Sequence, residues 1–100
     1  MTFIKVATIH DLKDGEAKVV DANGTPIALY RVNGKFYATT NTCAHRGGPL
    51  GEGVLDNEVI TCPWHGWRFN VASGINVIMP SIKIQTYKVE VRSDDVFVDV

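Results

Sequence analysis

The sequence predicts an all-β fold, an antiparallel β-sandwich of two packed sheets that carries an inserted subdomain of two loops. Short β-branched and apolar runs alternate with polar residues along most of the chain, as in half-buried strands. Turn residues separate these runs at short intervals. Only residues 10–13 hint at a helical turn. The turn signals place the insertion at approximately residues 41–80 of a single domain spanning residues 1–100.

The first forty residues are expected to form strands joined by tight turns. Asn33-Gly34 is the strongest hairpin signal in the chain, because both residue types accept the left-handed backbone of a two-residue turn. A second turn is expected at Ala22-Asn23-Gly24-Thr25. The strands expected around these turns are residues 3–8, 17–21, 26–31 and 35–40.

The rest of the chain also reads as short strands. Asn57 is expected to turn between two strands of the insertion, and Ser73-Gly74 between two more. Near the C-terminus, Ser93-Asp94-Asp95 is a further turn. The strands expected here are residues 54–56, 58–61, 68–71, 75–78, an alternating stretch through Ile82, Ile84, Val89 and Val91, and residues 96–100.

Two short motifs, Cys43-x-His45 and Cys62-x-x-His65, carry the chemistry of the chain. Each supplies one thiolate and one imidazole. A site with two Cys and two His is the ligand set of a [2Fe–2S] centre in which His replaces Cys on one iron. Residues so close in sequence converge on one site only if the backbone turns sharply. Glycine and proline make such turns, and they flank both motifs at Gly47, Gly48, Pro49, Pro63 and Gly66.

The segments Cys43-Ala44-His45-Arg46-Gly47 and Cys62-Pro63-Trp64-His65-Gly66-Trp67 resemble the two ligand loops of Rieske-type iron–sulfur proteins. The resemblance implies the Rieske fold, with Cys43 and Cys62 on the inner iron and His45 and His65 on the outer, solvent-facing iron. It covers most of the chain. It is closest to soluble ferredoxins that pass electrons from a flavin-dependent reductase to a terminal oxygenase in bacterial ring-hydroxylating systems.

The chain departs from the Rieske subunits of respiratory complexes at four positions. Those subunits have a loop-bridging disulfide where this chain has Gly48 and Trp64, and its only two cysteines are both needed as ligands. Hydroxyl donors of the high-potential group are replaced by Trp67 and Phe69. Without these donors we expect a potential at the low end of the Rieske range, on the order of −150 mV.

Other residues near the motifs have candidate roles in contacts. Trp64 either forms part of a partner-docking surface or only packs its own loop. Met79 and Pro80 resemble the proline loop that covers the cluster in this family, although a simple turn would have the same sequence. Arg46 and Arg68 either influence the potential and partner binding or are solvated surface charges.

Two other functions remain open from the sequence. Zinc also binds two Cys and two His, but usually with both Cys before both His. A small Rieske-like subunit of a larger redox enzyme, such as a nitrite-reductase-like assembly, would have the same fold, although such subunits often lack the ligands. The chain shows no nucleophile and base pair and no nucleotide-binding glycine loop, so we expect an electron-transfer protein and not an enzyme by itself.

Composition agrees with a small carrier. One hundred residues with 45% hydrophobic content suit one modest core. A net charge of −1 without a basic cluster argues against nucleic acid binding. No signal peptide and no apolar run near the ~20 residues of a membrane span is evident. We therefore expect a cytoplasmic monomer that binds no membrane.

Overall fold

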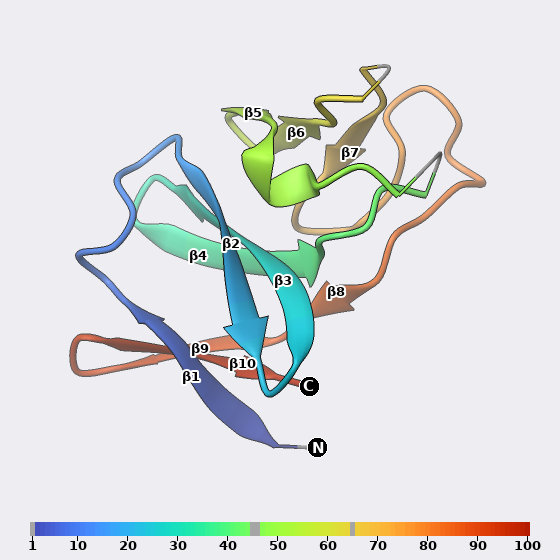
Figure 1. Cartoon of the computed structure of the whole chain (residues 1–100). Helices are drawn as coiled ribbons and strands as arrows, with labels where there is room; N and C mark the ends of the chain where they lie inside the picture. Colours follow the sequence, from blue (N-terminus) through green and yellow to red (C-terminus); the bar gives the residue numbers. More distant parts are fainter. Residues whose placement is uncertain (1, 45–46, 65) are drawn as a thin grey trace.

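The computed structural model describes residues 2–44, 47–64 and 66–100. These residues form ten strands in three antiparallel sheets, with one short 3₁₀ turn. Figure 1 shows how the strands are arranged in space. The predicted all-β class is therefore confirmed. The strands are β1 (Phe3–Thr8), β2 (Ala17–Ala22), β3 (Thr25–Val32), β4 (Lys35–Thr40), β5 (Val54–Asp56), β6 (Val59–Thr61), β7 (Arg68–Asn70), β8 (Thr86–Tyr87), β9 (Val89–Arg92) and β10 (Asp95–Asp99), and the 3₁₀ turn η1 is Leu50–Glu52.

The central sheet has the order β2-β3-β4-β8. Its first three strands are joined by two-residue turns, in which Asn23 and Gly24, and then Asn33 and Gly34, all have positive φ. Positive φ at both turn residues gives the turn a twist that matches the flanking antiparallel strands. The predicted hairpins are thus present.

The second sheet joins the two ends of the chain in the order β1-β10-β9. It packs on the central sheet around a base core, which we define as Ala7, Leu12, Val20, Ala22, Ile27, Leu29, Phe36, Ala38, Val96 and Val98. Arg31 closes the side of this sandwich, because its Nη1 donates hydrogen bonds to the carbonyl oxygens of Ile9 and Leu12, each at 2.9 Å. The segment at residues 10–13, expected to be weakly helical, is an irregular turn.

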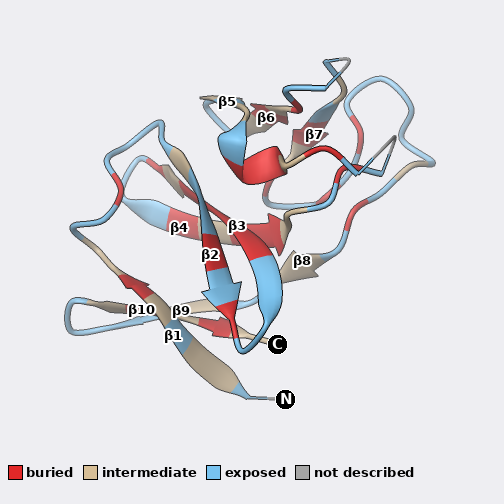
Figure 2. Ribbon diagram, viewed as in Figure 1, coloured by how far each residue is buried: buried red, intermediate tan, exposed pale blue. Residues whose placement is uncertain are grey.

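The third sheet, β5-β6-β7, lies between β4 and β8 in the chain and covers the other face of the central sheet. Between them is a loop-side core, defined as Ala28, Tyr30, Val32, Cys43, Leu50, Ile60, Cys62, Phe69, Val71 and Ile84. Figure 2 shows the buried residues of β3 at the centre of the fold. Side chains alternate along a strand, so Ile27 and Leu29 enter the base core while Ala28 and Tyr30 enter the loop-side core.

One expected strand is wrong, and another is confirmed only in its second half, where Val89 and Val91 lie in β9. Residues 75–78 form only isolated bridges, because the buried Asn76 side chain accepts the backbone N–H groups of Ile78 and Met79, each at 2.9 Å, and turns the chain. Ile82 and Ile84 likewise lie outside any strand, although Ile84 is buried. The short strand β8, which pairs with Ala38 and Thr39 of β4, lies within the alternating stretch expected from Ile82 to Val91.

Candidate iron–sulfur site

The first ligand loop leaves the end of β4 and is closed at its base by backbone hydrogen bonds. Cys43 N donates to Gly48 O, and Gly47 N donates to Cys43 O, both at 2.9 Å. Gly47 has a φ of 73°, a conformation that glycine adopts without strain. This closed turn directs Cys43 inward, where its side chain is only 2% exposed.

The second ligand loop connects β6 to β7. Their pairing ends at Thr61 and Arg68, and one further bond, from Cys62 N to Trp67 O at 2.7 Å, closes the loop. Gly66 again supplies a positive φ of 73°. Cys62 is 2% exposed, and its Sγ accepts the backbone N–H of Trp64 at 3.4 Å.

The structure brings the thiols of Cys43 and Cys62 together. Both are free cysteines. Burial raises the pKa of the Cys62 thiol, the N–H of Trp64 lowers it, and the neighbouring Cys43 raises it further by hydrogen bonding and by charge. The Cys62 thiol is therefore difficult to ionise unless a cation lies beside it.

The other two predicted ligands, His45 and His65, lie outside the described residues, as does Arg46. In the part of the chain that the structure describes, no group of three or more His, Cys, Asp or Glu side chains comes together. The described half of the site nevertheless fits an iron–sulfur cluster. Paired thiols on glycine-supported loops, with a backbone N–H directed at a ligand sulfur, are the protein groups such a cluster uses.

The two aromatic residues after the second motif have different environments. Phe69 is fully buried in the loop-side core, whereas Trp67 is partly buried. Their ring centroids are 6.4 Å apart. Neither side chain carries a hydroxyl.

A third loop follows β7 and rises on the same side of the molecule as the ligand loops (Figure 1). Its start is attached to β7, because Val77 N donates to Arg68 O at 3.1 Å. It contains the predicted Met79 and Pro80, both exposed, and Ile78, whose side chain is 70% exposed. Sequence reasoning missed Asn76, the buried amide that shapes this loop.

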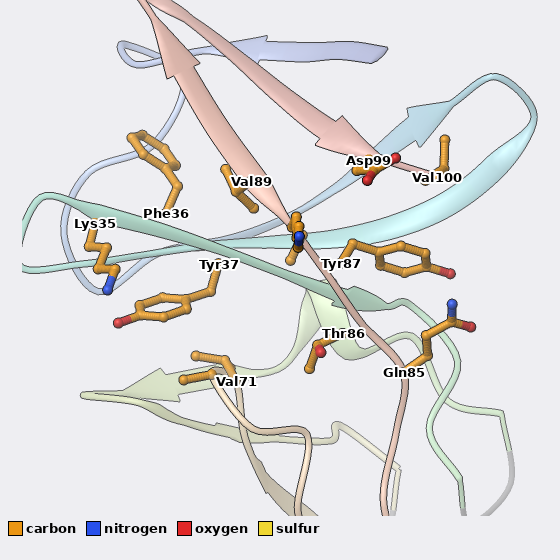
Figure 3. Close-up of a pocket in the computed structure, with 13 residues that line it drawn as sticks. Lys35, Phe36, Tyr37, Val71, Gln85, Thr86, Tyr87, Val89, Asp99 and Val100 are labelled. Carbon is orange, nitrogen blue, oxygen red and sulfur yellow. The ribbon is translucent and has the colours of Figure 1, made fainter. Parts of the chain in front are cut away.

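A groove of about 710 Å³ lies elsewhere, between β4, β8 and the start of β9 (Figure 3). Lys35, Tyr37, Tyr87 and Lys88 are among the residues that line it. None of its lining residues is a Cys or His, so it is separate from the thiol pair.

Comparison with known proteins agrees with this geometry. The Rieske [2Fe-2S] domain model matches residues 2–88. Ferredoxin CarAc of Metapseudomonas resinovorans is 40% identical over 96% of this chain and 92% of its own. The solved ferredoxin of carbazole 1,9a-dioxygenase from Nocardioides aromaticivorans IC177 is 32% identical, covers 98% of this chain and 97% of its own, and superposes with a TM-score of 0.89.

A third similar protein belongs to a structure described as the complex of reduced oxygenase and oxidized ferredoxin in carbazole 1,9a-dioxygenase. It is 40% identical over 96% of this chain and 91% of its own, with a TM-score of 0.88. The chain belongs to the Rieske [2Fe–2S] domain family.

Within that family it is a ferredoxin, an electron carrier whose cofactor is the [2Fe–2S] cluster. The predicted Rieske fold and cofactor are thereby confirmed. Zinc, the rival metal, is not the ion of this family.

Proposed function

We propose that this chain is the ferredoxin component of an aromatic ring-hydroxylating dioxygenase system, in which it carries single electrons from a flavin-dependent reductase to a terminal oxygenase. The observation that carries the proposal is the pair of buried, adjacent thiols of Cys43 and Cys62 on two closed loops. Similarity over nearly the whole length of dioxygenase ferredoxins supports the same role.

In this proposal Cys43 and Cys62 hold the inner iron, and His45 and His65 hold the outer iron. The cluster, when bound, supplies reversible one-electron chemistry. The buried cysteines fix it to the loop-side core and exclude water from the sulfur side. The imidazoles would then be the point at which a partner receives the electron.

The oxygenase is expected to dock on the side of the three loops. Trp64 is 50% exposed and Ile78 70% exposed, and large apolar side chains this open are common at contact surfaces. Arg68 adds an exposed positive charge next to the second loop. A solved complex of a similar ferredoxin with its oxygenase supports an oxygenase as acceptor, whereas the reductase is inferred from the resemblance alone.

The cellular setting of the proposal is the cytoplasm, with residues 1–100 as one domain, its cluster-binding part at approximately 41–80, and a monomer as the working form. No helix in the described ranges is long and apolar enough to cross a membrane. The small net charge of −1 gives no basis for nucleic acid binding.

The first test is an absorption and EPR spectrum of protein purified without air, before and after reduction. Visible absorption and an EPR signal on reduction are expected, together with two irons and two labile sulfides per chain. Electron delivery is then measured by mixing the reduced protein with a dioxygenase-type terminal oxygenase and following cluster reoxidation. Protein without iron, or a reduced protein that no such oxygenase reoxidises, would refute the proposal.

The alternative is a small subunit of a larger redox enzyme, such as a nitrite-reductase-like assembly. Size-exclusion chromatography separates the two. A carrier elutes as a monomer, whereas an obligate subunit associates through an exposed apolar face.

A further inference from the structure

Gly48, at the end of the first ligand loop, touches the second loop directly. It is buried. A Cβ atom built on it would lie 2.7 Å from Cys62 Sγ and 3.0 Å and 3.1 Å from Cγ and Cβ of Trp64. Real Cβ atoms essentially never approach another atom closer than 3.0 Å. The backbone of the first loop therefore fills the space beside the ligand sulfur of the second.

The glycine is not needed here for its backbone conformation. Its neighbour Gly47 has a positive φ, but Gly48 does not. An alanine at position 48 would consequently be free of backbone strain, and its only conflict would be the collision of its methyl group with Cys62 and Trp64. The requirement at this position is for space next to a sulfur atom.

We propose that Gly48 is a positioning residue for the cluster: its missing side chain lets the first loop close against Cys62 Sγ and fixes that sulfur in its ligating place. The proposal rests on the cluster assigned to Cys62 above. Trp64 closes the remaining side, because its side chain lies against Gly48 and its backbone N–H donates to the same sulfur. Together the two residues hold the ligand sulfur between loops and keep water from it.

The matched pair Gly48→Ala and Gly51→Ala tests the proposal in the cluster-loaded protein. Gly51 is only three positions away and also lacks a positive φ. A Cβ on Gly51 would lie 2.7 Å from Val19 Cγ2, 2.9 Å from Val19 N and 3.0 Å from Asn41 Oδ1, so the same methyl group meets crowding against β2 and Asn41 instead of a ligand sulfur. Each protein is measured by far-UV circular dichroism, by EPR after reduction, and by the rate at which a chelator removes iron.

Gly48→Ala is expected to retain the wild-type circular dichroism, to show shifted EPR g-values, and to lose iron roughly five- to tenfold faster, in line with the usual effect of overpacking. Gly51→Ala should melt at a lower temperature but keep the wild-type EPR spectrum. Wild-type g-values and iron loss in Gly48→Ala would overturn the proposal. Loss of the β-sheet signal in that variant would also overturn it, because position 48 would then serve the fold.

The double variant Gly48→Ala/Trp64→Gly separates the two contacts. It removes the Trp64 side chain but leaves Cys62 Sγ in the path of the new methyl group. The reference is the single variant Trp64→Gly, which itself exposes the sulfur. Iron loss faster than in Trp64→Gly supports the sulfur contact as the decisive one, whereas a rate equal to that of Trp64→Gly would show that Gly48 only accommodates Trp64. A wild-type protein without any cluster would instead refute the proposed function, so the two failures are distinguishable.

Discussion

Tyr30 and Thr39 form a buried hydrogen-bonded pair. Removing the Tyr30 hydroxyl should destabilise the wild-type protein but stabilise the Thr39→Val variant. Both side chains are fully buried, and their hydroxyl oxygens are 2.8 Å apart. Thr39 Oγ1 already donates to the carbonyl of Thr40 at 2.9 Å, so in this arrangement the Tyr30 hydroxyl is the donor to Thr39. Burial raises the pKa of Tyr30. This increase keeps the phenol protonated and able to donate.

Removing the Tyr30 hydroxyl and removing the Thr39 hydroxyl should therefore lower the free energy of unfolding by different amounts. Tyr30→Phe leaves Thr39 with its own acceptor and should lower the free energy of unfolding by about 1 kcal/mol. Thr39→Val leaves the phenol O–H buried without an acceptor and should cost about 2 kcal/mol, since an orphaned buried donor loses its full solvation. Adding Tyr30→Phe to Thr39→Val removes the orphan and should restore about 1 kcal/mol.

Thermal unfolding of the four loaded proteins, followed without air by circular dichroism at one scan rate, measures this cycle. Each kcal/mol should move the midpoint by about 4–8 °C in a domain of this size. The midpoints should fall in the order wild type, Tyr30→Phe, Thr39→Val, with the double variant above Thr39→Val. A double variant that melts below both single variants would refute the assignment of Tyr30 as donor.

The cluster should titrate on the order of −150 mV, because Trp67 and Phe69 carry no hydroxyl to stabilise added charge, and a midpoint well above zero in a redox titration would contradict this. His65→Cys should lower the potential further, since a thiolate adds negative charge; an unchanged value in an intact variant would count against the charge argument. Trp64→Ala should keep the visible spectrum but slow reoxidation by the oxygenase in stopped-flow mixing, and loss of the spectrum would assign Trp64 a structural role. Arg31→Met should lower the free energy of unfolding by about 2 kcal/mol in a denaturant titration, since two loop carbonyls lose a charged donor, while the EPR spectrum stays unchanged.

Local signals in the sequence predicted the fold correctly where residues adjacent in the chain determine the backbone conformation. The Asn-Gly turns, the left-handed Asn57 and most strand positions follow from residues that are adjacent in the chain. The strand predicted at residues 75–78 was wrong, although the β-branched residues of this segment suit a strand. The side chain of Asn76 accepts hydrogen bonds from the N–H groups of Ile78 and Met79, so the chain turns there. The alternating stretch from Ile82 to Val91 predicted β9, but it did not separate β8, which pairs through only two residues, from the irregular chain before it.

The candidate site, like the fold, could be predicted from the sequence only in part. Cys43 and Cys62 could be found from motif spacing, and the structure brings them together. The roles of His45 and His65 stay predictions, because both lie outside the described residues. The approach of the two loops at Gly48 and Trp64 was implied by the disulfide that respiratory subunits have there, but the contact of Gly48 with Cys62 Sγ could be found only in the structure.

Four consecutive residues of β3, Ile27 to Tyr30, are fully enclosed, and they alternate between the two cores. Close-packed protein interiors are barely compressible, so this strand resists deformation. The cysteine loops rest against it through the loop-side core. The sulfur side of the proposed centre, at Cys43 and Cys62, therefore has little room to rearrange when an electron arrives or leaves, which favours rapid electron exchange in both directions.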